Sequence, residues 1–270
     1  MKNSKKLQYL FLILMARALF SSALAGQETN IFSQRRDHLR QRLGIDAKAV
    51  LFSGVSNQLI DKNFFYLTGI KEPMSVLLIF PIEGDDFLFI PDVGNNAKVN
   101  TIAKISGLAQ ILPMIEFEYI FSYLYSWQNK IYFPDPNRPD DYGSNLIRSV
   151  MSRHPQFTLK DLNPILTEMR MVKSPEEIAL LNEAIGITAN GLINAIRQSK
   201  PGMYEYEIQT IIEDTFRALG AEGTSFNSII GSGPNSVIIH YDQNTRMTEP
   251  GDLVVMDVGA EYSGYAGDLT

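Results

Sequence analysis

The chain is 270 residues long, with 45% hydrophobic and 20% charged residues, which is enough for two domains with buried cores. Its formal net charge is −6, so nucleic acid and anionic membranes, which attract basic surfaces, are not expected as partners. The absence of cysteine excludes disulfides, thiolate metal sites and cysteine nucleophiles. Any metal ion must therefore be held by Asp, Glu and His, and the three histidines are His38, His154 and His240.

The first 25 residues have the pattern of a signal peptide. Three lysines precede an apolar stretch, Leu10–Ala16, and Ala23-Leu24-Ala25 provides a small-x-small cleavage site. The apolar stretch is shorter than the about 20 residues of a spanning helix, so no stable membrane span is expected. We expect export to the periplasm or secretion. The alternative is a cytoplasmic protein whose first residues form a buried helix or reflect a misassigned start codon.

Residues 26–160 are predicted to form an N-terminal α/β domain. Short apolar strands and helical segments are separated by Pro, Gly and Asp residues, and no Gly-rich phosphate loop or nucleophile elbow is present. The predicted helices are 32–43, 97–105, 116–124 and 144–152, and the predicted strands are 49–52, 64–67, 75–80, 87–90 and 130–133.

Residues 161–270 are predicted to form a second domain. Ser174-Pro175-Glu176-Glu177 is typical of a helix start, with Ser174 as the N-cap and Glu177 at the third helical position. A second helix is expected at 204–219, and strands at 225–230 and 236–241 are expected on either side of a Gly-rich turn. The first helix extends to about residue 198 and has one apolar face, formed by Ile178, Leu181, Ile185, Leu192 and Ile196.

The most informative segment is 253–270, which reads LVVMDVGAEYSGYAGDLT. If its turn centres on Tyr262 and Ser263, Asp257 and Asp268 face each other across a hairpin, with Cβ atoms roughly 5 Å apart. Facing carboxylates repel, so such a pair keeps one proton or binds a cation, and oxygen ligands suit a hard or borderline divalent metal. On spacing alone, two ordinary turn residues are the alternative. Two carboxylates do not complete a two-metal site.

His240 is the histidine that could join such a site. It is expected at the end of the apolar strand 236–241, one strand away from the hairpin, where a neutral imidazole could stabilise a developing oxyanion. A structural histidine at a strand end is the alternative. His38, on a charged helix, and His154, beside Pro155, are expected to be exposed and to have no catalytic part.

Four motifs in chain order resemble the aminopeptidase P, prolidase and creatinase family. An N-terminal element, NFFYLTGIKEP at 63–73, is similar to that family as well. The resemblance implies an α/β fold class, with a creatinase-like α/β domain followed by the first part of a pita-bread (α+β) catalytic domain. The motifs are EMRMVKSPEEI (168–178), KPGMYEYEI (200–208), SFNSIIGSGPNSVIIHY (225–241) and PGDLVVMDVGAEYSGYAGDLT (250–270).

The resemblance also implies two-metal hydrolysis of the peptide bond before a proline, by a metalloaminopeptidase. In the family the first hairpin aspartate binds one metal and the second bridges both, and these roles fall on Asp257 and Asp268. The substrate-side histidine, which stabilises the tetrahedral intermediate, falls on His240. The implied cofactors are two divalent ions, usually Mn²⁺, with Co²⁺ or Zn²⁺ as alternatives. The implied partners are proline-containing peptides and, in the full-length form, other copies in a homo-oligomer.

The family pattern also requires a further His and two Glu ligands downstream of the hairpin. This sequence stops at Thr270, and neither His38 nor His154 lies in a matching segment. We therefore expect a C-terminally truncated, inactive fragment of an Xaa-Pro aminopeptidase. One alternative is a prolidase-type dipeptidase. The paired aspartates count against a metal-free creatinase-type hydrolase, and together with His240 they count against a non-enzymatic pita-bread binding module.

Overall fold

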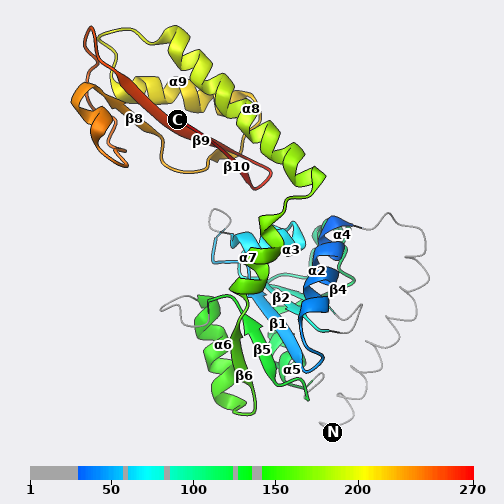
Figure 1. The fold of residues 1–270 in the computed structure, drawn as a ribbon. Coiled ribbons are helices and arrows are strands. Elements are labelled where there is room, and N and C mark those ends of the chain that lie inside the picture. Colours follow the sequence, from blue (N-terminus) through cyan, green and yellow to red (C-terminus); the bar gives the residue numbers. More distant parts are fainter. Residues whose placement is uncertain (1–29, 57–59, 82–85, 124–126, 136–141) are drawn as a thin grey trace. The chain divides into compact units, whose positions relative to one another are not determined.

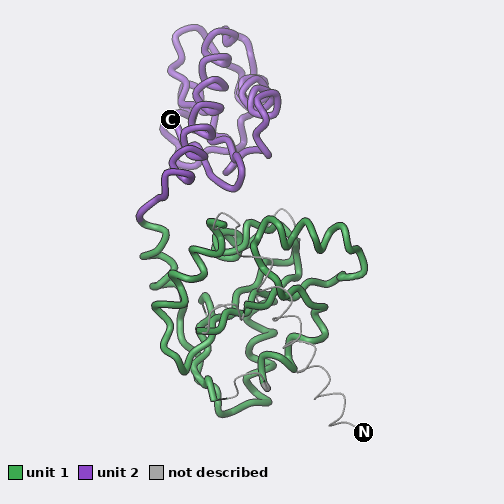
Figure 2. The backbone as a smooth tube through the Cα atoms, turned by 90° about the vertical axis from the view of Figure 1, so that its right-hand side faces the viewer, with its two compact units in different colours: residues 1–171 green, residues 172–270 purple. Residues whose placement is uncertain are grey.

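The computed structural model describes residues 30–56, 60–81, 86–123, 127–135 and 142–270. The chain forms two compact units, residues 1–171 and 172–270 (Figure 2). The predicted signal peptide, residues 1–25, lies outside the described residues and stays a prediction. Within the described ranges, no helix combines the length and the apolar character that crossing a membrane requires.

The first unit is built around a mixed six-stranded sheet in the order β4-β3-β2-β1-β5-β6 (Figure 1). The central strand β1 pairs antiparallel with β2 and parallel with β5. β2 and β3 are antiparallel, whereas β3 and β4, and β5 and β6, are parallel. The strands are β1 (Ala47–Phe52), β2 (Val76–Ile79), β3 (Phe87–Ile90), β4 (Gln110–Pro113), β5 (Lys130–Phe133) and β6 (Thr158–Asp161).

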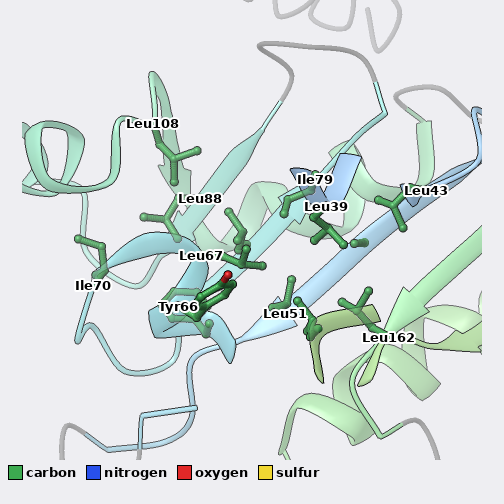
Figure 3. Close-up of a cluster of buried hydrophobic side chains, with 14 of the residues drawn as sticks. Leu39, Leu43, Leu51, Tyr66, Leu67, Ile70, Ile79, Leu88, Leu108 and Leu162 are labelled. Carbon is green, nitrogen blue, oxygen red and sulfur yellow. The ribbon is translucent and has the colours of Figure 1, made fainter. Parts of the chain in front are cut away.

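Helices cover both faces of this sheet, and each face has its own apolar core. One core joins alternate strand residues to α2 (Ile31–Arg42), α3 (Lys62–Thr68), α4 (Asn96–Ser106) and α7 (Asn163–Met171); Figure 3 shows part of it. The other core is rich in Phe and includes side chains from α5 (Phe117–Tyr123), which follows the short 3₁₀ helix η1 (Met114–Glu116), and from α6 (Tyr142–Arg153). Alternation along each strand therefore supplies both cores, which confirms the α/β prediction.

Residues 64–67 were predicted as a strand, and this prediction is wrong. They lie in α3, whose N-cap Asp61 accepts hydrogen bonds from Asn63 N and Phe64 N. The helix ends at Gly69, which has a left-handed φ of 68°. The aromatic residues favour a strand locally, but the cap, the terminal glycine and the burial of Phe64 and Leu67 one turn apart favour the helix.

The sequence placed the domain boundary between residues 160 and 161, whereas the first compact unit extends to Met171. The difference arises because α7 packs Leu166 and Met169 into the first core. The sequence analysis did not predict α7, nor the edge strands β4 and β6. The other predicted helices and strands of this unit agree with α2, α4, α5, α6, β1, β2, β3 and β5.

The second unit consists of two long helices packed on one face of a small antiparallel sheet (Figure 1). β9 is the central strand and pairs with β7, β8 and β10. The core between helices and sheet includes Ile212 and Phe216 from α9 and Val258 and Ala260 from β9. The elements are α8 (Pro175–Gln198), α9 (Glu205–Ala218), β7 (Gly223–Thr224), β8 (Ile229–Ser232), the 3₁₀ helix η2 (Gly233–Val237), β9 (Val254–Tyr262) and β10 (Tyr265–Leu269).

Helix α8 begins as predicted, but it does not bury the predicted face. Ser174 and Glu177 form a capping box, and Pro175 is the first helical residue. The buried face contains the smaller residues Ala184, Thr188, Gly191 and Ala195 together with Ile187. A Cβ at Gly191 would lie 2.5 Å from the Phe216 ring, so close packing against α9 selects this face. Of the predicted face, Ile178, Ile185 and Ile196 are exposed and Leu181 and Leu192 are half-buried.

Candidate metal centre

The hairpin of β9 and β10 brings Asp257 and Asp268 together, but its strand pairing differs from the predicted one by two residues. Tyr262 pairs with Tyr265, so the turn residues are Ser263 and Gly264, with φ values of 48° and 81°. This is the φ pattern of a type I′ turn, which favours Gly at its second position. The predicted turn at Tyr262 and Ser263 is therefore wrong by one residue.

The two aspartates are consequently diagonal rather than directly opposite. Asp268 pairs with Gly259, and Asp257 pairs on its other side with Ile229 of β8. Diagonal neighbours have Cα atoms about 7–8 Å apart, somewhat more than facing residues. Because Asp257 and Gly259 are two residues apart, both carboxylates still lie on the same face of the sheet.

This face is the one that points away from the two helices. Val258 and Ala260 lie on the opposite face of β9 from Asp257, and their side chains pack in the core between the sheet and the helices. In β10 the neighbour of Asp268, Gly267, faces α8, where a Cβ would lie 2.5 Å from the Ala184 carbonyl. The close packing of one face thus fixes the direction of the carboxylates on the other.

A cavity of about 400 Å³ lies on this outer face. Asp257, Asp268 and His240 all contribute to its lining, so the structure brings the three predicted site residues together. The wall combines two apolar side chains with polar and acidic ones; the remaining lining residues are Phe226, Asn227, Ile229 and Asp242.

His240 reaches the cavity from a loop and not from the predicted strand 236–241. Residues 233–237 form η2, and His240 itself has a left-handed φ of 54°. Val237 and Ile239 are 83% and 85% exposed, so the β-branched run that suggested a strand is not paired or buried. The exposed loop carries the imidazole to the outer face of the sheet.

The cavity is strongly acidic. Its lining residues in the described part of the chain include three carboxylates and one imidazole but no Lys or Arg side chain. Asp257 Oδ1 accepts a 3.1 Å hydrogen bond from the Thr270 hydroxyl, and Asp242 Oδ2 accepts one of 3.3 Å from Asn227. None of these carboxylates forms a salt bridge with another described residue. An uncompensated acidic cavity attracts cations.

The residues fit part of a divalent metal site. Asp257 and Asp268 provide oxygen ligands on one face of one hairpin, the ligand type that hard divalent ions take. Among the described residues, no group of three or more His, Asp or Glu side chains is close enough to hold an ion. The carboxylate pair therefore supplies a minority of a coordination sphere.

The other two histidines lie in the first unit. His38 is exposed on α2, as predicted. His154 was expected to be exposed, but its side chain is only 18% exposed and its Nε2 lies 2.9 Å from the Ser122 hydroxyl. Packing against Phe157 accounts for this burial.

The sequence analysis missed two polar anchors behind the cavity, Glu205 and Asn244. Both are buried: Glu205 binds the segment that contains His240 from α9, and Asn244 belongs to that segment and binds Ser228 and Ile230. One signal was present for Glu205: it occupies the same helical face as Ile208, Ile212 and Phe216, where an apolar residue is expected.

Residues 179–270 match the signature of Metallopeptidase family M24. The chain belongs to this family. It is 31% identical to the Xaa-Pro aminopeptidase of Escherichia coli (strain K12), over 88% of this chain and 60% of that protein. The chain spans about 60% of the length of the curated relatives it matches.

Solved structures agree with this assignment. Proline aminopeptidase P II from Yersinia pestis has a TM-score of 0.76 and 29% identity, covering 88% of this chain and 61% of that chain. Aminopeptidase P from E. coli with the inhibitor Pro-Leu has a TM-score of 0.74 and 29% identity, covering 90% and 62%. The expected fold class, an α/β domain followed by part of a pita-bread domain, is confirmed.

Proposed function

We propose that this chain carries the first part of the dimetal centre of an Xaa-Pro aminopeptidase. Asp257 and Asp268 are the proposed metal ligands, and His240 is the proposed substrate-side residue. The observation that supports this is the placement of all three side chains on the lining of one acidic cavity, on the outer face of the β9–β10 hairpin. Two solved variants of the E. coli enzyme carry aspartate-to-alanine substitutions at positions with the same sequence separation as Asp257 and Asp268.

Five of the lining residues have distinct proposed parts. The hydrogen bond from Thr270 would orient Asp257 to hold one ion, and the exposed Asp268 would contribute its carboxylate to the same centre. The His240 imidazole donates an N–H to the oxygen on which negative charge develops. Phe226 and Ile229 give the apolar wall that a proline ring requires. The bound ions supply Lewis-acid polarisation of the peptide carbonyl.

We further propose that these 270 residues do not hydrolyse peptides by themselves. Two carboxylates leave most of a coordination sphere to water, so divalent ions bind weakly. Mn²⁺ is the proposed ion, with Co²⁺ and Zn²⁺ as alternatives; a solved form of the E. coli enzyme is zinc-substituted. The carboxylate ligands are compatible with each of these ions and do not select among them.

The test is a chimaera in which residues 1–270 are followed by the C-terminal part of the E. coli relative that lies beyond the matched region. With Mn²⁺ present, the chimaera should cleave an Xaa-Pro peptide, and the 270-residue chain should not. Asp268→Ala should abolish cleavage in the chimaera. His240→Ala should leave its metal content near normal and lower kcat.

Mass-spectrometric metal analysis beside the cleavage assay separates these outcomes. Full activity of the Asp268→Ala chimaera, or tight stoichiometric metal in the 270-residue chain, would contradict the proposed site. Inactivity of the chimaera with both ions bound would contradict the proposed reaction.

Export is a separate proposal, because only the sequence of residues 1–25 supports it. Protein recovered from an extracytoplasmic fraction should begin at Gly26 or within a residue or two of it. An intact Met1 on protein from the cytosol would contradict this proposal.

A further inference from the structure

Glu205 is a fully buried carboxylate at the start of α9. Its side chain is 0% exposed, and it shares a helical face with Ile208, Ile212 and Phe216. A carboxylate in such a place is strongly destabilising unless hydrogen bonds replace its water. The contacts of Glu205 therefore indicate what its negative charge holds in place.

Five groups donate hydrogen bonds to this carboxylate. Oε1 accepts from Ser232 N and Ser232 Oγ, both at 2.7 Å, and from Asn235 Nδ2 at 3.1 Å. Oε2 accepts from Tyr241 OH at 2.7 Å and from Arg246 N at 2.9 Å. Burial by itself raises the pKa of Glu205, but these hydrogen bonds outweigh it and hold the pKa below its ordinary value.

All five donors belong to one segment, residues 232–246. Ser232 and Arg246 are its two ends, and Tyr241 directly follows His240. The Glu205 backbone adds a further bond, from its N–H to the Arg246 carbonyl, 3.0 Å long. One side chain thus closes the loop at both ends and binds it beside the imidazole.

Apart from the bonds to Glu205, the side chains around His240 have one longer bond to a described residue outside the loop, from Asn227 Nδ2 to Asp242 Oδ2 at 3.3 Å. Val237 and Ile239 are largely exposed, and His240 forms no hydrogen bond with another described residue. The second anchor, Asn244, binds the inner part: its Oδ1 accepts from Ile230 N, and its Nδ2 donates to Ser228 O. Asn244 attaches the loop to β8 and also to α9, where its Nδ2 lies 2.9 Å from Gln209 Oε1. Tyr241, which directly follows His240, binds α9 through its hydroxyl at Glu205.

We propose that Glu205 is a positioning residue, which fixes the 232–246 loop so that His240 faces Asp257 and Asp268 across the cavity. The proposal rests on the proposed function for the identity of the metal ligands. It goes beyond that function in one respect. The Glu205 carboxylate, which contacts neither the imidazole nor a bound ion, sets the distance between them by holding the loop.

The test is nuclear magnetic resonance of the 270-residue chain with labelled histidines. The sequence contains three histidines, so three imidazole signals are expected, and comparison with His240→Gln identifies one of them. Mn²⁺ is paramagnetic and broadens nearby signals with the inverse sixth power of distance. Mg²⁺ is the diamagnetic reference. Asp268→Asn measures any broadening that does not come from the proposed site.

The variants are Glu205→Gln and, as matched control, Glu207→Gln. Glu207 lies two residues further on in the same helix, is exposed, and accepts from Tyr204 N. An amide at position 205 cannot accept all five bonds, so the loop loosens. At equal Mn²⁺ occupancy, the broadening of His240 should fall at least threefold in Glu205→Gln and stay unchanged in Glu207→Gln. Mn²⁺ affinity should stay within about twofold in both.

Tyr241→Phe is the milder variant if Glu205→Gln does not fold, because it leaves the carboxylate with four donors and otherwise removes only the 3.3 Å bond that the hydroxyl accepts from Thr245 N. It should reduce the His240 broadening in the same direction. Wild-type broadening in both Glu205→Gln and Tyr241→Phe would overturn the positioning role alone. Absence of site-dependent broadening of His240 in the wild type would overturn the proposed metal arrangement and this inference with it. A purely structural role would lower the urea midpoint and leave the broadening of the folded protein unchanged.

Discussion

The hydroxyl oxygen of Thr188 on α8 lies 3.0 Å from the carbonyl oxygen of Gly267, the residue that precedes Asp268 in β10. The same hydroxyl accepts a 3.0 Å hydrogen bond from Ala260 N in β9. Thr188 is 0% exposed, so neither bond competes with water. One side chain therefore joins both strands of the hairpin to the helix, directly behind the face that carries the carboxylates.

Replacing Thr188 by Val should loosen this attachment. The change keeps the shape of the side chain but removes the hydroxyl, which accepts from Ala260 N and shares its one hydrogen between Gly267 O and Ala184 O, at 3.0 and 2.9 Å. The expected loss of stability is about 1–3 kcal/mol. Urea denaturation measures the loss, and amide exchange in β10 should accelerate. Thr210→Val is the control, because Thr210 is exposed on α9 and its hydroxyl bonds only within its own helix. Equal midpoints for the two variants would show that Thr188 does not hold the hairpin.

Gly259 and Gly186 should respond in opposite ways to replacement by Ala. A Cβ at Gly259 would lie 2.4 Å from Ser225 Oγ and 2.7 Å from the Phe226 ring, so Gly259→Ala should cost about 1–3 kcal/mol and displace Phe226 in the cavity wall. A Cβ at Gly186 on α8 would meet nothing within 4 Å. Gly186→Ala should stabilise the helix by about 0.5–1 kcal/mol. Thermal denaturation of both variants compares them, and a stable Gly259→Ala would contradict the packing of the hairpin.

The capping box of α8 predicts a smaller effect. Glu177 N donates to Ser174 Oγ at 3.3 Å, and Ser174 N donates to Glu177 Oε2 at 2.9 Å. Ser174→Ala removes the first bond and should cost about 1 kcal/mol. Ser152→Ala, at an exposed position in α6, is the matched control and should change the denaturation midpoint little. An unchanged denaturation midpoint in Ser174→Ala would show that the cap does not contribute measurably to stability.

Local patterns made much of the fold predictable from the sequence. The capping box at Ser174 and the apolar strand that contains Asp257 depend on residues a few positions apart, and both are found in the structure. The turn was misplaced by one residue, and the strand pairing therefore by two, because tyrosines flank Ser263-Gly264 on both sides. The preference of type I′ turns for a glycine at the second position would have located the turn.

The failures at 236–241 and at Glu205 have a common cause. The run Val237-Ile238-Ile239 favours a strand locally, but no strand pairs with it, and the conformation of the loop is set by bonds to Glu205. Those partners are 27 to 41 residues away in sequence, so no local pattern contains them. Three residues that line the cavity, His240, Asp257 and Asp268, were predicted as site residues, and the residues that hold the His240 loop in place were not.

Lys48 gives the first unit a predictable pH dependence. Its side chain is 0% exposed in β1 and lies 4.6 Å and 4.7 Å from the ring centroids of Phe121 and Phe157, while its ammonium donates to the Phe121 carbonyl. It forms no salt bridge with another described residue. Burial lowers the pKa of Lys48 to about 8, from an ordinary value of 10.5.

The sign of the effect follows from proton binding. Below pH 8 the lysine is charged in both states, and the folded state bears the full cost of burying the charge. Between pH 8 and 10.5 the unfolded chain binds more protons, so the contribution of Lys48 to stability becomes less unfavourable as pH rises. Lys48→Met should therefore stabilise the unit at pH 7, by an amount on the order of 3 kcal/mol at most, and this advantage should shrink by pH 9.5. Urea denaturation of both proteins at pH 7, 8.5 and 9.5 tests this, with Lys104→Met on the exposed side of α4 as control. A difference between wild type and Lys48→Met that stays constant across this range would mean that the buried lysine does not titrate there.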